Sequence, residues 1–259
     1  MRCWIISLAA AVALSCSVKE DRTGCACILV LDMTSCSDAP DNVRIDLRTS
    51  GGRIEQDFIP GRDSPLYEYP VPKGMCTLSA YICPRELSQE TEAIVIDPGD
   101  NCPELFASVS SFEAAGETAQ HRVVLHKQYA GVTLDLGDSS WQGSDCTVIA
   151  KGEVCGVSLA DLRPLEGIYL YQVPAAGDGT RRFRLPRQTG AGAQALTLEL
   201  QAPGAAPRTF DLGKYLQEAG YDWDAEDLQD ITVKVRDSEI LVEISSCDWT
   251  IQSRQTVVI

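Results

Sequence analysis

The chain has 259 residues with 37 acidic and 22 basic side chains, which gives a formal net charge of −15 at pH 7. So negative a field disfavours binding to nucleic acid and to anionic membrane surfaces, and it favours solubility outside the cell. The length is sufficient for one large domain or two ordinary domains with real hydrophobic cores, and we expect two.

Residues 1–15 have the pattern of a signal peptide. Arg2 supplies a positive charge, and residues 4–14 form an apolar run that is too short to cross a bilayer as a helix. The run ends at the small residue Ser15 and is followed by Cys16, an ending that resembles a lipobox. We therefore expect cleavage before Cys16 and acylation of this cysteine, palmitate included, which would anchor the chain in the outer membrane. The alternative is a plain secretory signal with a cysteine near its end.

Residues 16–24 are expected to form a lipidated tether. Within it, Lys19, Glu20 and Asp21 resemble the lysine-plus-acidic export signal that follows the acylated cysteine in surface-exposed lipoproteins of Bacteroidetes. That resemblance implies an outer-membrane lipoprotein that faces the cell exterior. Composition alone indicates only a solvated tether.

From Cys27 onward, short runs of alternating or β-branched residues are separated by Gly, Pro, Asp and Asn, a pattern typical of an all-β sandwich or barrel. In the first half the predicted strands are 28–33, 43–49, 53–59, 66–71, 76–83, 93–97, 106–113 and 120–126. In the second half they are 131–136, 146–150, 168–173, 181–185, 195–201, 231–236, 240–245 and 249–259.

One helix is predicted among the strands of the second half. Asp211 is its expected N-cap, Leu212, Leu216 and their neighbours form an apolar stripe, and Gly220 suits the left-handed position after the last turn. Strand sets of similar size lie on either side of residues 127–130. We therefore predict an N-terminal β-sandwich domain over 25–128 and a C-terminal one over 129–259.

Eleven cysteines are an unusually large number. Cys3 lies in the signal peptide and Cys16 is the lipid site, which leaves nine. In an exported chain these nine indicate disulfides rather than buried thiols, and the odd number leaves at least one unpaired. Cys146 and Cys155 could face one another across a hairpin that turns near residues 150–151, and this is the one pairing that we predict.

No motif in the sequence indicates catalysis, a cofactor or a metal. Gly156-Val157-Ser158-Leu159-Ala160 fails the last position of a hydrolase nucleophile elbow, and Gly190-Ala191-Gly192 precedes an alternating strand, so we predict a hairpin turn there instead of a dinucleotide-binding loop. The acidic run over residues 222–230 lacks the spacing of a calcium loop and is predicted to cap a helical turn and face solvent. We expect no enzyme and no small-molecule substrate.

Pairs of tyrosines lie on the same face of two predicted strands. Tyr67 with Tyr69, or Tyr169 with Tyr171, could form a platform on which a sugar stacks, although same-face aromatic pairs more often belong to a core. A surface glycan-binding lipoprotein is therefore the alternative function. A hydrolase comes third, because the carboxylates have no motif around them.

Two segments resemble the fimbrillin-associated anchor lipoproteins of Bacteroidetes type V fimbriae. The first is the lipobox followed by residues 19–25, and the second is the helix from Asp211, the Gly220-Tyr221-Asp222-Trp223 turn, the strand to Val233 and the closing Trp249. The resemblance implies two tandem transthyretin-like β-sandwich domains that hold the base of a fimbrium at the outer membrane. Its implied partners are the major and accessory fimbrial subunits, and no catalysis is involved.

Assembly in that family proceeds by strand exchange, in which the C-terminal segment of one subunit fills a groove in the next through main-chain hydrogen bonds. The tail of this chain is β-prone, and its apolar residues are Ile251, Val257, Val258 and Ile259. It could be a donated strand or the final strand of the protein's own sheet, and both alternatives remain open.

Overall fold

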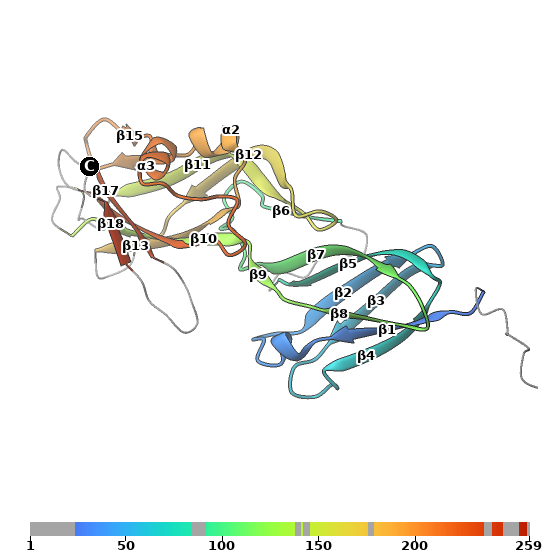
Figure 1. Ribbon diagram of the computed structural model, residues 1–259. Coiled ribbons are helices and arrows are strands. Elements are labelled where there is room, and N and C mark those ends of the chain that lie inside the picture. The colour runs from blue at the N-terminus through green and yellow to red at the C-terminus, as the bar shows by residue number, and fades with distance from the viewer. Residues whose placement is uncertain are drawn as a thin grey trace, which may run out of the picture.

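The structure is a computed structural model that describes residues 24–83, 92–137, 141, 146–175, 179–235, 240–245 and 254–257. The predicted signal peptide and almost all of the tether lie outside these ranges. Within them, four β-sheets pair into two sandwiches that lie end to end (Figure 1). The predicted all-β class is confirmed.

The first sandwich packs a three-stranded sheet on a five-stranded sheet. The smaller sheet has the order β4-β1-β8, and its strands are β1 (Cys27–Asp32), β4 (Leu66–Val71) and β8 (Thr118–Arg122). The larger sheet has the order β3-β2-β5-β7-β9, and its strands are β2 (Val43–Thr49), β3 (Gly52–Phe58), β5 (Gly74–Ile82), β7 (Phe106–Ala114) and β9 (His126–Lys127). A short 3-10 turn, Thr34–Cys36, follows β1.

The core of this sandwich comes from the alternation that the sequence displays. Successive side chains of a strand point to opposite faces, so Leu29 and Leu31 of β1 and Ile45 and Leu47 of β2 all point inward and are fully buried. Each such side chain contributes roughly 1.5–3 kcal/mol through burial. The pairing of β1 is antiparallel to β4 and parallel to β8.

The second sandwich packs two further sheets around a larger core. One has the order β13-β10-β16-β17-β18, with β10 (Tyr129–Asp135), β13 (Thr180–Pro186), β16 (Asp230–Val235), β17 (Ile240–Ser245) and β18 (Arg254–Val257). The other has the order β12-β11-β14-β15, with β11 (Thr147–Ser158), β12 (Pro164–Gln172), β14 (Thr197–Gln201) and β15 (Arg208–Phe210), and β6 (Ala93–Val95) also pairs with β11.

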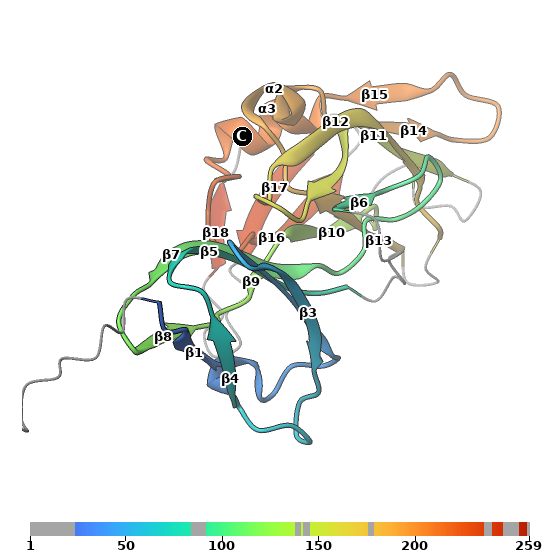
Figure 2. The ribbon, with the colours of Figure 1, turned by 90° about the vertical axis from the view of Figure 1, so that its right-hand side faces the viewer.

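The segment between β5 and β7 leaves the first sandwich, contacts the second and then returns to the first. β6 pairs with β11, and Ile96 and Cys102 lie in the second core, after which the chain returns to the first sandwich as β7. A small cluster around Ile94, Leu105 and Val157 contains residues from both halves of the sequence. Figure 2 shows β6 beside the strands of the second sandwich.

In the described part of the second sandwich there are two helices, where one was predicted. The predicted helix is α3 (Leu212–Glu218), and its expected caps are confirmed: Asp211 accepts a hydrogen bond from Lys214 N at 3.2 Å, and Gly220 has a φ of +73°. The hairpin turn predicted at Gly190 is wrong. Residues Gly190–Gln194 form α2, because the Thr189 hydroxyl caps it and the helix packs against α3.

The hairpin predicted between Cys146 and Cys155 is also wrong, because β11 continues as an extended strand through residues 150–151. Its backbone stays paired there with β12 and with β14, and register shifts near Gly152 and Gly156 interrupt the ladder without reversing the chain. Nine positions of extended chain span roughly 30 Å, far more than a disulfide allows. Both cysteines are free thiols in the structure.

Candidate functional site

The connection between the two sandwiches is held by a loop that lies about 100 residues further along the chain. This loop, residues 221–230, is called the joint loop below. Asp227 accepts hydrogen bonds from Lys127 N at 2.6 Å and pairs with His126 Nδ1 at 3.0 Å, while Leu228 N donates to Lys127 O at 3.1 Å. The backbone and one side chain of the connection are therefore bound directly.

Lys127 is a nearly buried cation at this connection, 7% exposed. A buried charge is costly unless a partner compensates it. Its ammonium pairs with Asp230 and lies 4.8 Å from the ring centroid of Tyr129. Asp230 also accepts from Gly131 N at 2.8 Å, so one carboxylate links the connection to the start of β10.

Arg187 holds the joint loop from the side of the second sandwich. Its Nη1 donates to Trp223 O at 2.6 Å and to Ala225 O at 2.8 Å, and its Nη2 donates to Glu226 O at 3.1 Å. Its Nε donates to Gln128 Oε1 at 2.8 Å. Burial lowers the pKa of Arg187, and nearby Tyr221 and acidic residues of the loop oppose that shift. The planar fork of donors in arginine suits such a set of carbonyl acceptors.

The prediction for the acidic run was therefore only partly right. Asp222 does cap a local turn, since its carboxylate accepts from Asp224 N at 2.9 Å. Asp227 and Asp230 instead bind the connection between the sandwiches. Sequence reasoning missed this role, and it missed Arg187 altogether, because the partners are about 40 to 100 residues apart and follow no local motif.

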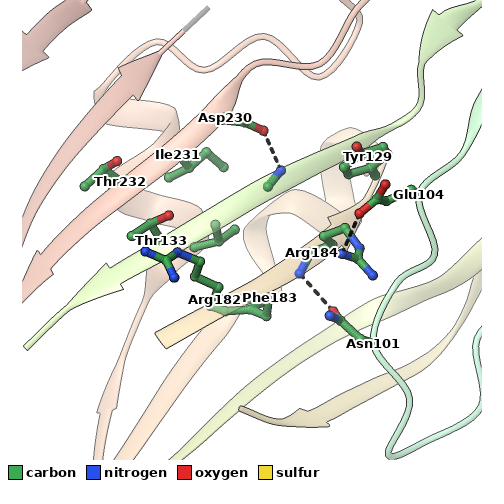
Figure 3. A pocket seen from close by; sticks show the side chains of 12 residues that line it. Asn101, Glu104, Tyr129, Thr133, Arg182, Phe183, Arg184, Asp230, Ile231 and Thr232 are labelled. Atoms are coloured by element: carbon green, nitrogen blue, oxygen red, sulfur yellow. Dashed lines mark hydrogen bonds and ion pairs between the residues drawn. The ribbon is translucent and has the colours of Figure 1, made fainter. Parts of the chain in front are cut away.

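A shallow polar depression of about 250 Å³ lies on the outward face of β10, β13 and β16 (Figure 3). Gly131 forms part of its floor: a Cβ there would lie 2.6 Å from Asp230 Oδ1. Arg184 reaches Glu104 at 3.0 Å on one side. Most of the side chains around it are charged or polar, so the depression suits hydrogen-bonded contact with a surface better than burial of an apolar ligand.

One edge of this sheet is covered and the other is formed by the end of the chain. At β13, Arg184 N donates to Asn101 Oδ1 at 2.9 Å and Arg184 Nε donates to Cys102 O at 2.7 Å, so the segment before β7 covers that edge. At the opposite edge, β18 pairs antiparallel with β17, and Val257 lies opposite Val242.

The residues predicted for lipidation and export, Cys16, Lys19, Glu20 and Asp21, lie outside the described residues. The same holds for Ile251, Val258 and Ile259 of the predicted donor tail, whereas Val257 is the last residue of β18. The structure thus places Arg254–Val257 in the protein's own sheet, while lipidation, the export signal and donation of the tail stay predictions.

The tyrosine pairs pack against the cores. Tyr67 and Tyr69 stack at 6.1 Å and contact the first core, and their hydroxyls bond to Asp63 and Gln56. Tyr169 is buried, and its hydroxyl donates to Arg184 O at 2.7 Å. The core interpretation of these residues is the correct one.

His121 and His126 have different partners. His121 bonds to Ser110 Oγ at 2.8 Å and stacks on Phe112, and burial lowers its pKa. In the described part of the chain, no group of three or more His, Cys, Asp or Glu side chains has the arrangement of a metal site. Within the same ranges, none of the helices has both the length and the apolar character needed to cross a bilayer.

Several solved structures resemble this arrangement. A candidate adhesin of Bacteroides thetaiotaomicron aligns with a TM-score of 0.59 and 12% identity over 88% of this chain and 98% of that chain. A candidate polysaccharide-binding protein of the same species aligns with a TM-score of 0.58 and 12% identity over 84% and 95%. The fimbrial anchor protein Mfa2 from Porphyromonas gingivalis aligns with a TM-score of 0.52 and 15% identity over 81% and 91%.

The chain has the fold of these adhesin and fimbrial proteins. The fold that the sequence resemblance implied is thereby confirmed. No protein-family model and no curated protein matches the sequence. At 12–15% identity the likeness concerns the fold.

Proposed function

We propose that the protein is an anchor and assembly subunit of a fimbrium, held at the outer face of the outer membrane by acyl chains on Cys16. The observation that supports this most is the fold shared with the fimbrial anchor protein of Porphyromonas gingivalis over 81% of the chain. The lipobox-like ending at Cys16 and the segment Lys19-Glu20-Asp21 would supply the anchor and the surface address. The partners are the major and accessory subunits of the fimbrium.

In this role the chain transmits tension from the membrane to the fimbrium. Force enters through the tether, passes into a first domain over residues 25–128, and crosses the joint into a second domain over residues 129–259. β1 and β18 lie in different sandwiches, so the load passes through both (Figure 1). The contacts of Arg187, Asp227 and Asp230 would then keep the two domains aligned under load.

The C-terminal segment is the part of the chain that we assign to contact with the next subunit. Among the described residues β18 pairs only with β17, and an edge strand offers main-chain donors and acceptors to a further strand. A four-residue edge strand can also leave its own sheet at low cost and be donated. Ile251, Val257, Val258 and Ile259 would supply the apolar side chains of a donated strand.

Anchoring is tested by Cys16→Ala in the native host. We expect the variant to move from the membrane fraction to the soluble fraction, with fimbriae released into the medium, because it can no longer be acylated. The matched control is Cys25→Ala, which alters the next exposed cysteine and should leave the protein in the membrane. A Cys16→Ala protein that stays in the membrane fraction would refute the lipid anchor.

The role of the tail is tested by deleting residues 250–259. We expect the shortened chain to fold and reach the membrane, since only an edge strand is lost, and to lose co-purification with the major fimbrial subunit. Fimbriae of normal length and retention in the deletion strain would show that the tail takes no part in assembly.

A further inference from the structure

Two cysteines on opposite sheets of the first sandwich point into its core. Cys27 is the first residue of β1 and Cys76 is the third residue of β5, and they are 0% and 1% exposed. The inward positions of the two strands continue with Leu29 and Leu78, both buried. Because inward positions alternate along a strand, each thiol faces the opposite sheet.

The connection between β7 and β8 places these two strand starts at the same end of the sandwich. Ala114, the last residue of β7, pairs with Gly74 at the start of β5. Shortly after it, Glu117 O accepts a hydrogen bond from Ile28 N at 2.9 Å, and β8 then runs parallel to β1. The turn at residues 115–117, in which Gly116 has a φ of +75°, therefore bridges the starts of β5 and β1.

Cys27 bonds to this turn, and Cys76 bonds to the residue that pairs with Ala114, just before the turn. Cys27 Sγ donates to Ala115 O at 3.7 Å, and Cys76 Sγ donates to Gly74 O at 3.9 Å, opposite Ala114. Burial raises the pKa of the Cys76 thiol, and the nearby Cys27 thiol acts in the same direction. Inward-facing cysteines on the two sheets of a sandwich are able to bond, as the disulfide between the sheets of immunoglobulin domains demonstrates.

Cys27 and Cys76 are free thiols in the structure. We propose that they form a disulfide bond in the exported protein, which ties β1 to the opposite sheet. Oxidising compartments outside the cytoplasm favour such bonds. The two thiols release two protons and two electrons to the disulfide of a thiol–disulfide oxidoreductase, which is left as a dithiol, and one S–S bond forms in the chain. Since both side chains are buried in the folded core, oxidation accompanies folding.

The bond has a mechanical consequence that rests on the proposed function. A chain held at Cys16 receives tension at β1, eleven positions later, and β1 belongs to the smaller sheet. The disulfide passes that load to β5, which lies at the centre of the five-stranded sheet. β1 then cannot be pulled out of the sandwich without breaking a covalent bond.

Mass spectrometry tests the bond directly. Free thiols of the full chain are alkylated in intact cells, and the protein is denatured, alkylated again without reductant and digested. We expect one cross-linked peptide pair that contains Cys27 and Cys76, and alkylated Cys36, which is buried in the same core. Alkylated Cys27 and Cys76, or a link from Cys76 to Cys25, would overturn the proposal.

A double-mutant cycle provides a second measurement. Cys27→Ala and Cys76→Ala should each lower the Tm by roughly 5–15 °C, and the double variant should fall no further, because either substitution removes the same bond. Losses that add in the double variant would mean that the thiols only pack, and would overturn the proposal. If the bond is present, a reductant should lower the Tm of the wild-type protein. Cys36→Ala is the matched control: it retains the bond, so a reductant should lower its Tm by a similar amount. The mass spectrometry and Tm measurements do not require membrane attachment. They can therefore fail or succeed independently of the Cys16→Ala test of the lipid anchor.

Discussion

Asp46 shows how a single buried charge is accommodated in the first sandwich. It is 6% exposed, and it accepts hydrogen bonds from Arg53 Nε at 2.9 Å and Nη2 at 2.8 Å and from Arg48 at 3.3 Å. Burial acts to raise the pKa of Asp46, but the two guanidinium groups outweigh it, and the net pKa lies below the ordinary value of 3.8. The ionised form therefore stabilises the folded state.

Asp46→Asn should destabilise the protein at neutral pH by about 1–2 kcal/mol, because charge-assisted hydrogen bonds are replaced by weaker ones. A depressed pKa contributes stability above the unfolded value and loses it as the pH falls through the folded value. The difference in the free energy of unfolding between wild type and variant should thus be constant above about pH 5 and vanish as the pH drops below 3.8. Denaturant titrations from pH 7 to pH 2.5 measure it.

The matched control for Asp46 is Asp41→Asn, an exposed carboxylate that accepts a hydrogen bond from the neighbouring Asn42 N. Its effect at neutral pH should lie within about 0.5 kcal/mol of zero. If Asp46→Asn were as mild as this control, or if its effect grew towards low pH, the role assigned to the Arg48 and Arg53 pairs would be wrong.

At the scale of elements, the joint loop is held through its backbone as well as through its side chains. Three of its carbonyl groups accept from Arg187, and its Leu228 amide donates to Lys127 O. Every residue has a backbone carbonyl, so the contacts of Arg187 with the loop require no particular side chain in the loop. In the sequence, only the arginine itself could indicate these contacts.

Arg187→Ala should destabilise the protein by about 1–3 kcal/mol, because three loop carbonyls and Gln128 Oε1 lose their donor. The loss should be local. We expect faster hydrogen exchange and faster proteolysis at residues 126–128 and within the joint loop, and Arg187→Lys should be intermediate because an ammonium cannot reproduce the fork.

Arg62→Ala is the control for this variant, since Arg62 is exposed and pairs only locally with Asp63. It should change neither exchange nor proteolysis at the joint. If hydrogen exchange and proteolysis at the joint loop were the same in Arg187→Ala and in the control, Arg187 would not hold the loop.

At the scale of the whole molecule, the two cores share no residue. The first is formed by residues between 27 and 123 and the second by residues between 96 and 244, and a small cluster of five buried residues lies between them. Two separate cores can unfold as separate cooperative units. The joint, the pairing of β6 with β11 and the small cluster together determine how strongly the units are coupled.

Calorimetry of the purified protein should therefore resolve two transitions. Asp46→Asn should shift only the transition of the first sandwich, and Arg187→Ala should separate the two further, because it weakens the contact through which they stabilise one another. A single transition that both substitutions shift equally would mean that the chain unfolds as one unit.

The strands were predictable where buried and exposed residues alternate along the sequence. Period-two alternation gave β1, β2, β10 and β16 nearly to their ends, because a strand with one buried face must alternate. The helix α3 was predictable from Asp211 and Gly220, since a cap is a local interaction between residues a few positions apart. The function class rested on a resemblance and not on any of these patterns.

The sequence alone determined the all-β class, the approximate positions of many strands and the caps of α3, all of which depend on local geometry. Only the tertiary structure decided that β11 runs on past residues 150–151, that α2 is a helix, that Arg187 and Asp227 build the joint, and that Cys27 and Cys76 lie in one core. Each of these depends on strands or side chains that meet from distant parts of the chain. Short apolar or glycine-rich segments have nearly balanced local preferences, so long-range pairing decides their conformation.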